Sequence, residues 1–302
     1  MMTQKIGLDI GRGYVKGYTE YNDQEYYCLF KSIVALGRDI DTSKYKEPIY
    51  MEYQNGDYFV GELAEKEGDS PIHNLKDDKT TPVVEKLIAA GLEKLAIRSN
   101  VSLMLGVPNK MFKKSEREKI QKHYKGKTFT VKNKLTGATK SITIDNIDVF
   151  REGDAALLWH TRNRECLEKP FGMVTVGFRT LELAYYDVNF IYNDKKSKTK
   201  ELGNKDALEY VQRKLDNDKG IMRELYEIDS SNNYDDYKKA AYDNLSERID
   251  VEIENAWLNL DEMEIKIGGG TALNLENLSF EVIEDSQMAT AKGLWFLAEE
   301  TM

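Results

Sequence analysis

Residues 8–16 read LDIGRGYVK, an apolar strand that runs directly into a tight turn containing Gly11 and Gly13. Glycine lets the backbone N–H groups of such a turn converge on an anion, in the nest geometry that holds phosphates. Asp9 stands at the end of the strand, where a carboxylate beside phosphates requires Mg²⁺ or its waters between them. Lys16 offers a point charge to the phosphate oxygens. A plain tight hairpin is the alternative interpretation.

Two later segments also place a glycine turn after a strand. Residues 175–182 read TVGFRTLE, in which Thr180 adds a hydroxyl donor. Residues 265–273 read IKIGGGTAL. Three glycines after a strand allow a flat ligand ring to lie on bare backbone, with the N-terminus of the following helix facing an anion. Each signal is weak by itself, whereas the three turns in this order are far more specific.

The apolar pattern predicts how these turns are connected. An antiparallel meander is expected at the start of the chain, because its short turns cannot hold a parallel crossover. The strand–turn–strand unit of residues 5–21 recurs at 173–192, and helices and a further strand follow each copy. The order therefore predicts a duplicated α/β unit with a cleft between its halves. The expected strands are 5–10, 15–21, 25–34, 101–107, 173–177, 181–192 and 264–267, and the expected helices are 83–96, 113–124, 153–162, 205–215, 237–260 and 288–299.

The composition is that of an ordinary soluble globular protein. The 302 residues are 41% hydrophobic and 31% charged, which fits about two domains. The sequence contains no apolar run near the roughly 20 residues of a membrane span and no basic leader, which argues against a transmembrane or secreted protein. Cys28 and Cys166 make no disulfide framework, so a reducing cytoplasm is expected, with both as small buried residues. The net charge of −9 argues against direct binding of nucleic acid.

Charge is distributed unevenly along the chain. Residues 110–140 contain eleven Lys or Arg and two acids, whereas residues 223–262 contain twelve acids and four basic residues. Two solvated faces are one interpretation. A pair of complementary surfaces is the other.

Together, the three turns resemble the two phosphate loops and the adenosine loop of the actin, heat-shock chaperone and sugar-kinase superfamily. The resemblance is closest to the prokaryotic actin-like ATPases of the ParM/StbA plasmid-segregation group. Four further segments extend it over nearly the whole chain: residues 30–35 (FKSIVA), 58–64 (YFVGELA), 106–108 (GVP) and 285–294 (DSQMATAKGL).

This resemblance implies an α/β fold that is actin-like (ribonuclease-H-like). Its duplicated domains would each have a mixed sheet flanked by helices, with the nucleotide cleft between them. The expected domains are residues 1–165 with 286–302, and residues 166–285.

The same resemblance implies binding of ATP or GTP with Mg²⁺. Asp9 and Glu182 would hold the metal through water, and Asp9 would also be catalytic. Residues 149–155 read VFREGDA and are similar to the family's V-x-P-E element, whose glutamate positions the water that attacks the γ-phosphate. Glu152 takes that place, and a helix-start carboxylate is the alternative interpretation. The expected nucleotide-binding residues are Gly11, Arg12, Gly13, Lys16, Gly177, Phe178, Arg179, Thr180, Gly268, Gly269, Gly270 and Thr271.

The chain departs from the family pattern at three positions. Thr175 stands where the family has an aspartate, the longer Glu182 replaces the aspartate at the far end of that loop, and Arg151 replaces the proline before the catalytic glutamate. Loss of the carboxylate at position 175 implies weaker positioning of Mg²⁺. Slow hydrolysis with retained nucleotide binding is therefore expected.

The function implied by the resemblance is that of a filament-forming ATPase whose polymerisation segregates plasmid or phage DNA. Its expected partners are further copies of the chain, arranged head to tail, and a DNA-bound adaptor of the ParR type in the cytoplasm. A head-to-tail contact that does not close generates an open filament, and the two charged regions are candidates for it. A small-molecule kinase of the same superfamily and a non-hydrolysing nucleotide-binding scaffold remain alternatives.

Overall fold

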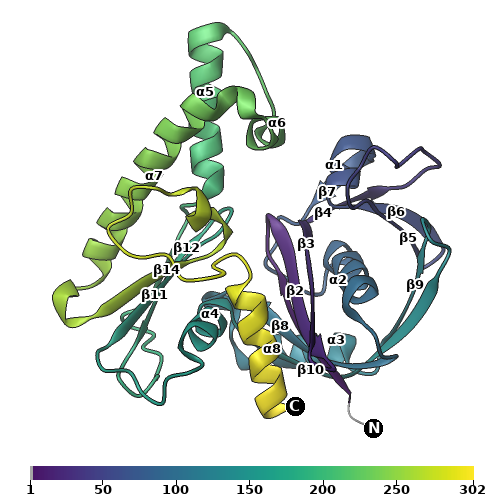
Figure 1. Cartoon of the computed structure of the whole chain (residues 1–302), viewed down its shortest axis with the longest axis horizontal. Coiled ribbons are helices and arrows are strands. Elements are labelled where there is room, and N and C mark those ends of the chain that lie inside the picture. The colour runs from purple at the N-terminus through teal and green to yellow at the C-terminus, as the bar shows by residue number, and fades with distance from the viewer. Residues whose placement is uncertain (1–2) are drawn as a thin grey trace. The chain divides into compact units, whose positions relative to one another are not determined.

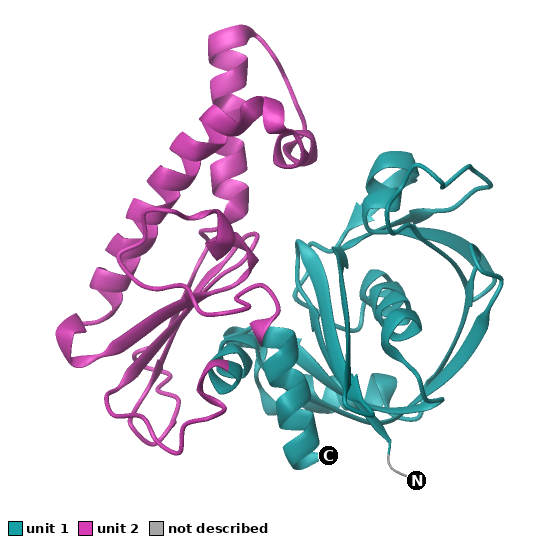
Figure 2. Cartoon of the chain, viewed as in Figure 1, with its two compact units in different colours: residues 1–159, 290–302 teal, residues 160–289 magenta. Residues whose placement is uncertain are grey.

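The structure is a computed structural model that describes residues 3–302. They form two compact units, one of residues up to 159 with 290–302, and one of residues 160–289 (Figures 1 and 2). Each unit contains a mixed sheet flanked by helices, which confirms the predicted α/β class. The domain limits expected from the sequence stay a prediction.

The first unit is built on a ten-stranded sheet in the order β3-β2-β1-β8-β10-β9-β5-β6-β4-β7. Strand β1 pairs antiparallel with β2 and parallel with β8, which in turn pairs parallel with β10. The carboxyl ends of β1, β8 and β10 therefore meet at one edge. The strands are Gln4–Ile10 (β1), Tyr14–Tyr21 (β2), Gln24–Lys31 (β3), Ile33–Leu36 (β4), Ile49–Tyr53 (β5), Gly56–Val60 (β6), Asp69–His73 (β7), Asn100–Val107 (β8), Thr128–Asn133 (β9) and Thr139–Arg151 (β10).

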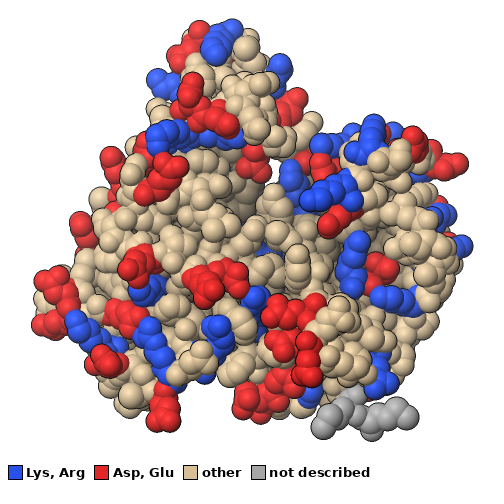
Figure 3. Space-filling model, in the orientation of Figure 1, with Lys and Arg blue, Asp and Glu red and all other residues tan. Residues whose placement is uncertain are grey.

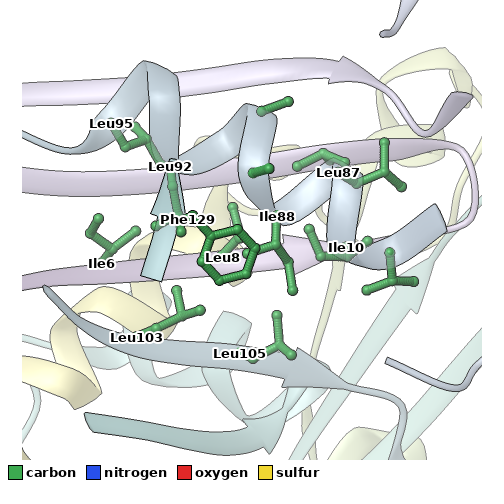
Figure 4. Packing of buried hydrophobic residues seen from close by; sticks show 14 of the residues in the cluster. Ile6, Leu8, Ile10, Leu87, Ile88, Leu92, Leu95, Leu103, Leu105 and Phe129 are labelled. Carbon is green, nitrogen blue, oxygen red and sulfur yellow. The ribbon is translucent and has the colours of Figure 1, made fainter. Parts of the chain in front are cut away.

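Helix α2 (Pro82–Leu95) forms the centre of the main core, and the strands of the sheet curve around it (Figure 1). Its first turn contains Pro82, and the Thr81 hydroxyl accepts a hydrogen bond from the N–H of Val84, as is usual at a helix start. Its apolar side chains pack against those of β1, β8 and β9 (Figure 4). Each fully buried side chain of this kind stabilises the fold by about 1.5–3 kcal/mol.

Helices α4 (Glu152–Thr161) and α8 (Ala289–Thr301) approach each other so closely that only glycine fits at their contact. A Cβ atom at Gly293 of α8 would overlap the carbonyl oxygen of Ala155 in α4. A Cβ atom at Gly7 of β1 would likewise overlap the backbone of α8 at Ala291. Close backbone contact thus fixes both helices in the first unit, which also contains α1 (Glu62–Glu67) and α3 (Lys114–Tyr124).

The second unit contains a four-stranded sheet in the order β13-β12-β11-β14. Strand β11 pairs antiparallel with β12 and parallel with β14, as β1 does with β2 and β8. The predicted duplication is therefore confirmed at the level of strand topology. The elements are β11 (Phe171–Val176), β12 (Leu181–Tyr186), β13 (Lys198–Lys200), α5 (Asn204–Lys219), α6 (Leu225–Ser230), α7 (Asp235–Ala256) and β14 (Glu264–Gly268).

The structure corrects several expectations from the sequence. The expected strand 25–34 is two strands that break at Ser32, and the expected strand 181–192 ends at Tyr186. Strand β10 was missed because a bulge between Ile144 and Asn146 shifts the alternation of its buried side chains. Cys166 is exposed rather than buried. Within residues 3–302, no helix has the length and apolar character needed to cross a membrane.

Candidate functional site

The first glycine turn is closed by one backbone hydrogen bond. The N–H of Gly11 donates to the carbonyl oxygen of Tyr14 over 3.0 Å, and a Cβ atom at Gly11 would lie only 2.8 Å from that oxygen. Glycine is therefore required by close approach. None of residues 11–14 has a positive φ, so the expected nest, which alternates right- and left-handed backbone, is not formed here.

Asp9 and Lys16 face each other across β1 and β2. The Lys16 Nζ atom lies 3.1 Å from Asp9 Oδ2, and the Asp9 side chain is buried. The other carboxylate oxygen, Oδ1, has no hydrogen-bond partner within residues 3–302. An unpaired buried carboxylate oxygen is costly, so Oδ1 is suited to accept a hydrogen bond from water that coordinates a cation.

Glu152 enters the same region without an intervening loop, because β10 ends at Arg151 and α4 begins at the next residue. A Cβ atom placed on Gly106, at the end of β8, would lie 3.2 Å from Glu152 Cγ and 3.6 Å from Asp9 Oδ1. Both carboxylate side chains therefore border the space that the glycine leaves. This explains physically why the GVP segment has glycine at its first position.

Lys79 completes this group and was not found from the sequence. Its side chain is buried, and its Nζ atom donates to the carbonyl oxygen of Ile10 over 2.7 Å and lies 3.5 Å from Glu152 Oε1. We call Asp9, Lys16, Lys79 and Glu152 the charged quartet. With both carboxyl groups ionised and both lysines protonated, the quartet has no net charge.

Electrostatics within the quartet shift one titration strongly. Burial raises the pKa of Glu152 to about 7, and the negative charge of Asp9 adds to the rise. Lys79 and Lys16 act in the opposite direction and hold the pKa down. Glu152 thus exchanges a proton near neutral pH, where a general base works best.

Two arginines near the quartet already have partners. The guanidinium of Arg12 pairs with Asp77, which also accepts from Lys110 over 2.8 Å. Arg151 pairs with Asp154, and its guanidinium lies 4.9 Å from the centre of the Phe112 ring. These contacts hold the Arg151 side chain beside the start of α4.

The second glycine turn has the same closure as the first. The N–H of Gly177 donates to the carbonyl oxygen of Thr180 over 2.9 Å. The carbonyl oxygen of Gly177 accepts from the Thr271 hydroxyl over 3.0 Å. The carbonyl oxygens of Gly177 and Phe178 also accept from the first N–H groups of α5, so this turn is fixed to that helix.

The remaining residues of this turn are placed by the β11–β12 register. Thr175 lies opposite Glu182, whose side chain is buried. Arg179 Nη2 lies 3.9 Å from Glu201 Oε2. The second turn therefore presents backbone groups, a hydroxyl-bearing residue at Thr180 and one buried carboxylate.

The triple glycine is constrained by packing rather than left bare. Gly269 has φ +94°, and a Cβ atom there would overlap the carbonyl oxygen of Val176 and lie 2.9 Å from its nitrogen. A Cβ atom at Gly268 would lie 2.8 Å from Met173 Cε, and one at Gly270 would lie 3.4 Å from the Gln287 side chain. The segment that follows is a short 3₁₀ turn, Gly270–Asn274, and not the expected helix.

The structure brings together Asp9, Lys16 and Glu152 in the first unit, and the second turn and triple glycine in the second unit. Asp9 and Glu182, the two expected Mg²⁺ residues, belong to different units. Residues 3–302 contain no group of three or more His, Cys, Asp or Glu side chains that could hold a metal ion. The unpaired Oδ1 atom of Asp9 fits a water-mediated Mg²⁺ contact.

Comparison with known proteins identifies the fold. Residues 7–153, nearly half of the chain, match the family described as "Actin like proteins N terminal domain". The chain also matches the crystal structure of Ta0583, an archaeal actin homologue, with a TM-score of 0.84 and 18% identity over 100% of both chains. The chain has an actin-like fold.

Two further structures agree with this assignment. A 15-stranded ParM filament from Clostridium botulinum matches with a TM-score of 0.82 and 20% identity, over 99% of this chain and 100% of that one. A complex of Ta0583 with ADP matches with a TM-score of 0.81 and 19% identity, over the same shares. No curated protein matches the chain by sequence. The actin-like chain therefore has the two-domain fold of prokaryotic actin homologues.

Proposed function

We propose that this actin-like protein binds ATP with Mg²⁺, hydrolyses it slowly, and forms head-to-tail filaments in the ATP state. The observation that carries the proposal is the charged quartet at the carboxyl ends of β1, β8 and β10. Ligands of open α/β sheets bind at such ends. Phosphoryl transfer needs little covalent chemistry, so positioned charges and one water-orienting carboxylate supply most of the catalysis.

In this proposal each residue of the quartet has a distinct task. Lys16 neutralises phosphate oxygens, and Asp9 Oδ1 accepts a hydrogen bond from water of the metal. Glu152 accepts a hydrogen bond from the attacking water and takes up its proton, for which a pKa near 7 is suitable. Bound Mg²⁺ would neutralise charge on the phosphates.

The second unit supplies the remaining nucleotide contacts in the proposal. Gly177, Phe178, Arg179 and Thr180 face phosphates, and Gly268, Gly269, Gly270 and Thr271 face the nucleoside. Gly11, Arg12 and Gly13 contribute from the first turn, which requires Arg12 to exchange Asp77 for phosphate. The ADP complex of the archaeal homologue supports nucleotide binding at this fold. GTP fits the same phosphate contacts.

Filament formation is supported by the similarity to the Clostridium botulinum ParM filament. By this similarity we also propose that the filament acts in the cytoplasm and segregates plasmid or phage DNA through a DNA-bound adaptor of the ParR type. The test is electron microscopy and pelleting with ATP and Mg²⁺, with ADP and Mg²⁺, and without nucleotide. Filaments should form with ATP and disappear as phosphate is released. Absence of polymer under all three conditions would contradict the proposal.

Fewer basic side chains are available to pair with another copy of the chain than the sequence indicates. Figure 3 shows acidic and basic side chains interspersed on the face that it draws. Most basic residues of 110–140 pair with acids of their own unit, namely Lys110, Lys114, Arg117, Lys119, Lys127, Lys132 and Lys134. Each exposed pair contributes at most about 1 kcal/mol. Apolar contacts must therefore supply most of the filament's stability.

A non-hydrolysing scaffold is favoured by one observation, the hydroxyl of Thr175 where the family has a carboxylate. Phosphate release separates it from the main proposal. Filaments that form with ATP while no phosphate appears would support the scaffold.

A further inference from the structure

Lys79 is a buried lysine at the centre of the candidate site. Its side chain is 4% exposed, and such burial of an ammonium is expensive unless charges and hydrogen bonds compensate it. Two groups do so. The Ile10 carbonyl oxygen accepts a hydrogen bond over 2.7 Å, and Glu152 Oε1 lies 3.5 Å away.

The backbone around Lys79 is held from several sides. Its own carbonyl oxygen accepts from the hydroxyl of the buried Tyr124 over 2.6 Å. On one side of it Asp78 pairs with Lys119, and on the other Thr81 starts α2. The segment therefore aims the lysine at a fixed point, where β1 ends and the first glycine turn begins.

Lys79 forms the one ion pair of Glu152 within residues 3–302. Without the lysine, Asp9 and Glu152, which both border the space beside Gly106, would have only Lys16 to compensate them. Repulsion between the carboxylates would then displace Glu152. Displacement removes the oriented carboxylate from the place where an attacking water needs it.

We propose that Lys79 is a positioning residue that holds the Glu152 carboxylate in the orientation that hydrolysis requires. This inference rests on the proposed function, because it assigns Lys79 to the hydrolytic step. Nucleotide binding does not depend on it, since Lys16 and the three glycine turns supply the phosphate and nucleoside contacts.

The test measures single-turnover phosphate release and ATP affinity for the parent, Lys79→Met and Lys79→Gln. Lys79→Met should slow release by roughly 10- to 100-fold, because a catalytic group displaced by about 1 Å costs up to about a hundredfold. The dissociation constant of a fluorescent ATP analogue should change less than about threefold. Lys79→Gln keeps a donor for the Ile10 carbonyl but no charge, and should be equally slow. Lys132→Met, which removes a half-exposed lysine of β9 paired with Glu52 in β5, is the control and should equal the parent.

A double variant decides whether Lys79 acts through Glu152. In the Glu152→Gln background, Lys79→Met should cause no further loss, since groups that act as a unit are not additive. A further loss of tenfold or more, or weaker ATP binding with an unchanged rate, would overturn the inference and assign the lysine directly to the phosphates. If the parent releases phosphate and the Lys79 variants release it at the same rate, this inference alone would be overturned. A parent that releases no phosphate would overturn the proposed hydrolysis and the role of Lys79 together.

Discussion

The two glycine turns share one backbone design and differ in their chemistry. Asp9 and Thr175 each stand two residues before the turn glycine, and Lys16 and Glu182 each stand five residues after it. Asp9 lies opposite Lys16, and Thr175 lies opposite Glu182. Duplication has thus preserved strand order, register and turn closure, while an acid and a base face each other in one unit and a hydroxyl and an acid in the other.

The difference indicates how work is divided in the proposed site. The first turn belongs to a group of two acids and two lysines without net charge, which suits the transfer of a proton from the attacking water. The second turn offers mainly backbone and a hydroxyl, which suits binding. The proposed division of work therefore rests on the side chains at paired positions, because the fold alone does not assign it.

The largest effect that we expect is a loss of stability on substitution of Gly269, compared with its neighbour Gly270. Gly269→Val should destabilise the protein by about 3 kcal/mol or more, because a side chain there overlaps the Val176 backbone and φ is +94°. Gly270→Ala places its Cβ atom 3.4 Å from Gln287 and should cost less than about 1 kcal/mol. Urea unfolding measures both. Equal stability of Gly269→Val and the parent would show that the second unit is packed differently.

The raised pKa of Glu152, beside the first turn, predicts that the free energy of unfolding depends on pH. Over the window from its ordinary pKa of 4.5 to about 7, the folded state holds a proton that the unfolded state has lost. Stability therefore falls as the pH rises through this window. Glu152→Gln cannot ionise, so it should exceed the parent in stability by about 1–3 kcal/mol at about pH 8.

Urea unfolding of the parent and Glu152→Gln at several pH values checks this. The difference should shrink towards zero as the pH falls to about 4.5. Glu118→Gln, on the exposed face of α3, is the control and should follow the parent. A Glu152→Gln variant less stable than the parent at about pH 8 would contradict the direction of the shift.

We expect smaller effects from alanine at Gly106 and at Gly268, which lie near the ends of β8 and β14. Gly106→Ala puts a Cβ atom 3.2 Å from Glu152 Cγ and should slow phosphate release by about tenfold through displacement of the carboxylate. Gly268→Ala meets the flexible end of Met173 at 2.8 Å and should change stability more than the hydrolytic rate. Phosphate release and unfolding of both variants are the measurements. Equal slowing by the two would remove the distinction between the turns.

Local patterns predicted the parts of this molecule that depend on neighbours in sequence. The strand–turn–strand units and α2 follow from alternation and helical spacing, and Asp9 and Lys16 lie on one hairpin. Lys79 could not be predicted, because its partners Ile10 and Glu152 lie far away in sequence on other elements. The predicted nest at the first glycine turn was wrong for another reason. Position 11 requires glycine because a Cβ atom there would lie too close to the Tyr14 carbonyl oxygen, and not because its backbone is left-handed.

The proposed division of labour is tested most directly by phosphate release and ATP affinity measured on the same samples of Glu152→Gln and Glu182→Gln. Glu152→Gln should slow release by roughly a hundredfold and leave the dissociation constant within about threefold, because a positioned acid–base group contributes about 10²–10⁴-fold. Glu182→Gln should slow release by no more than about tenfold. Unchanged release by Glu152→Gln, or a greater loss in Glu182→Gln, would contradict the account and place the hydrolytic chemistry outside the charged quartet.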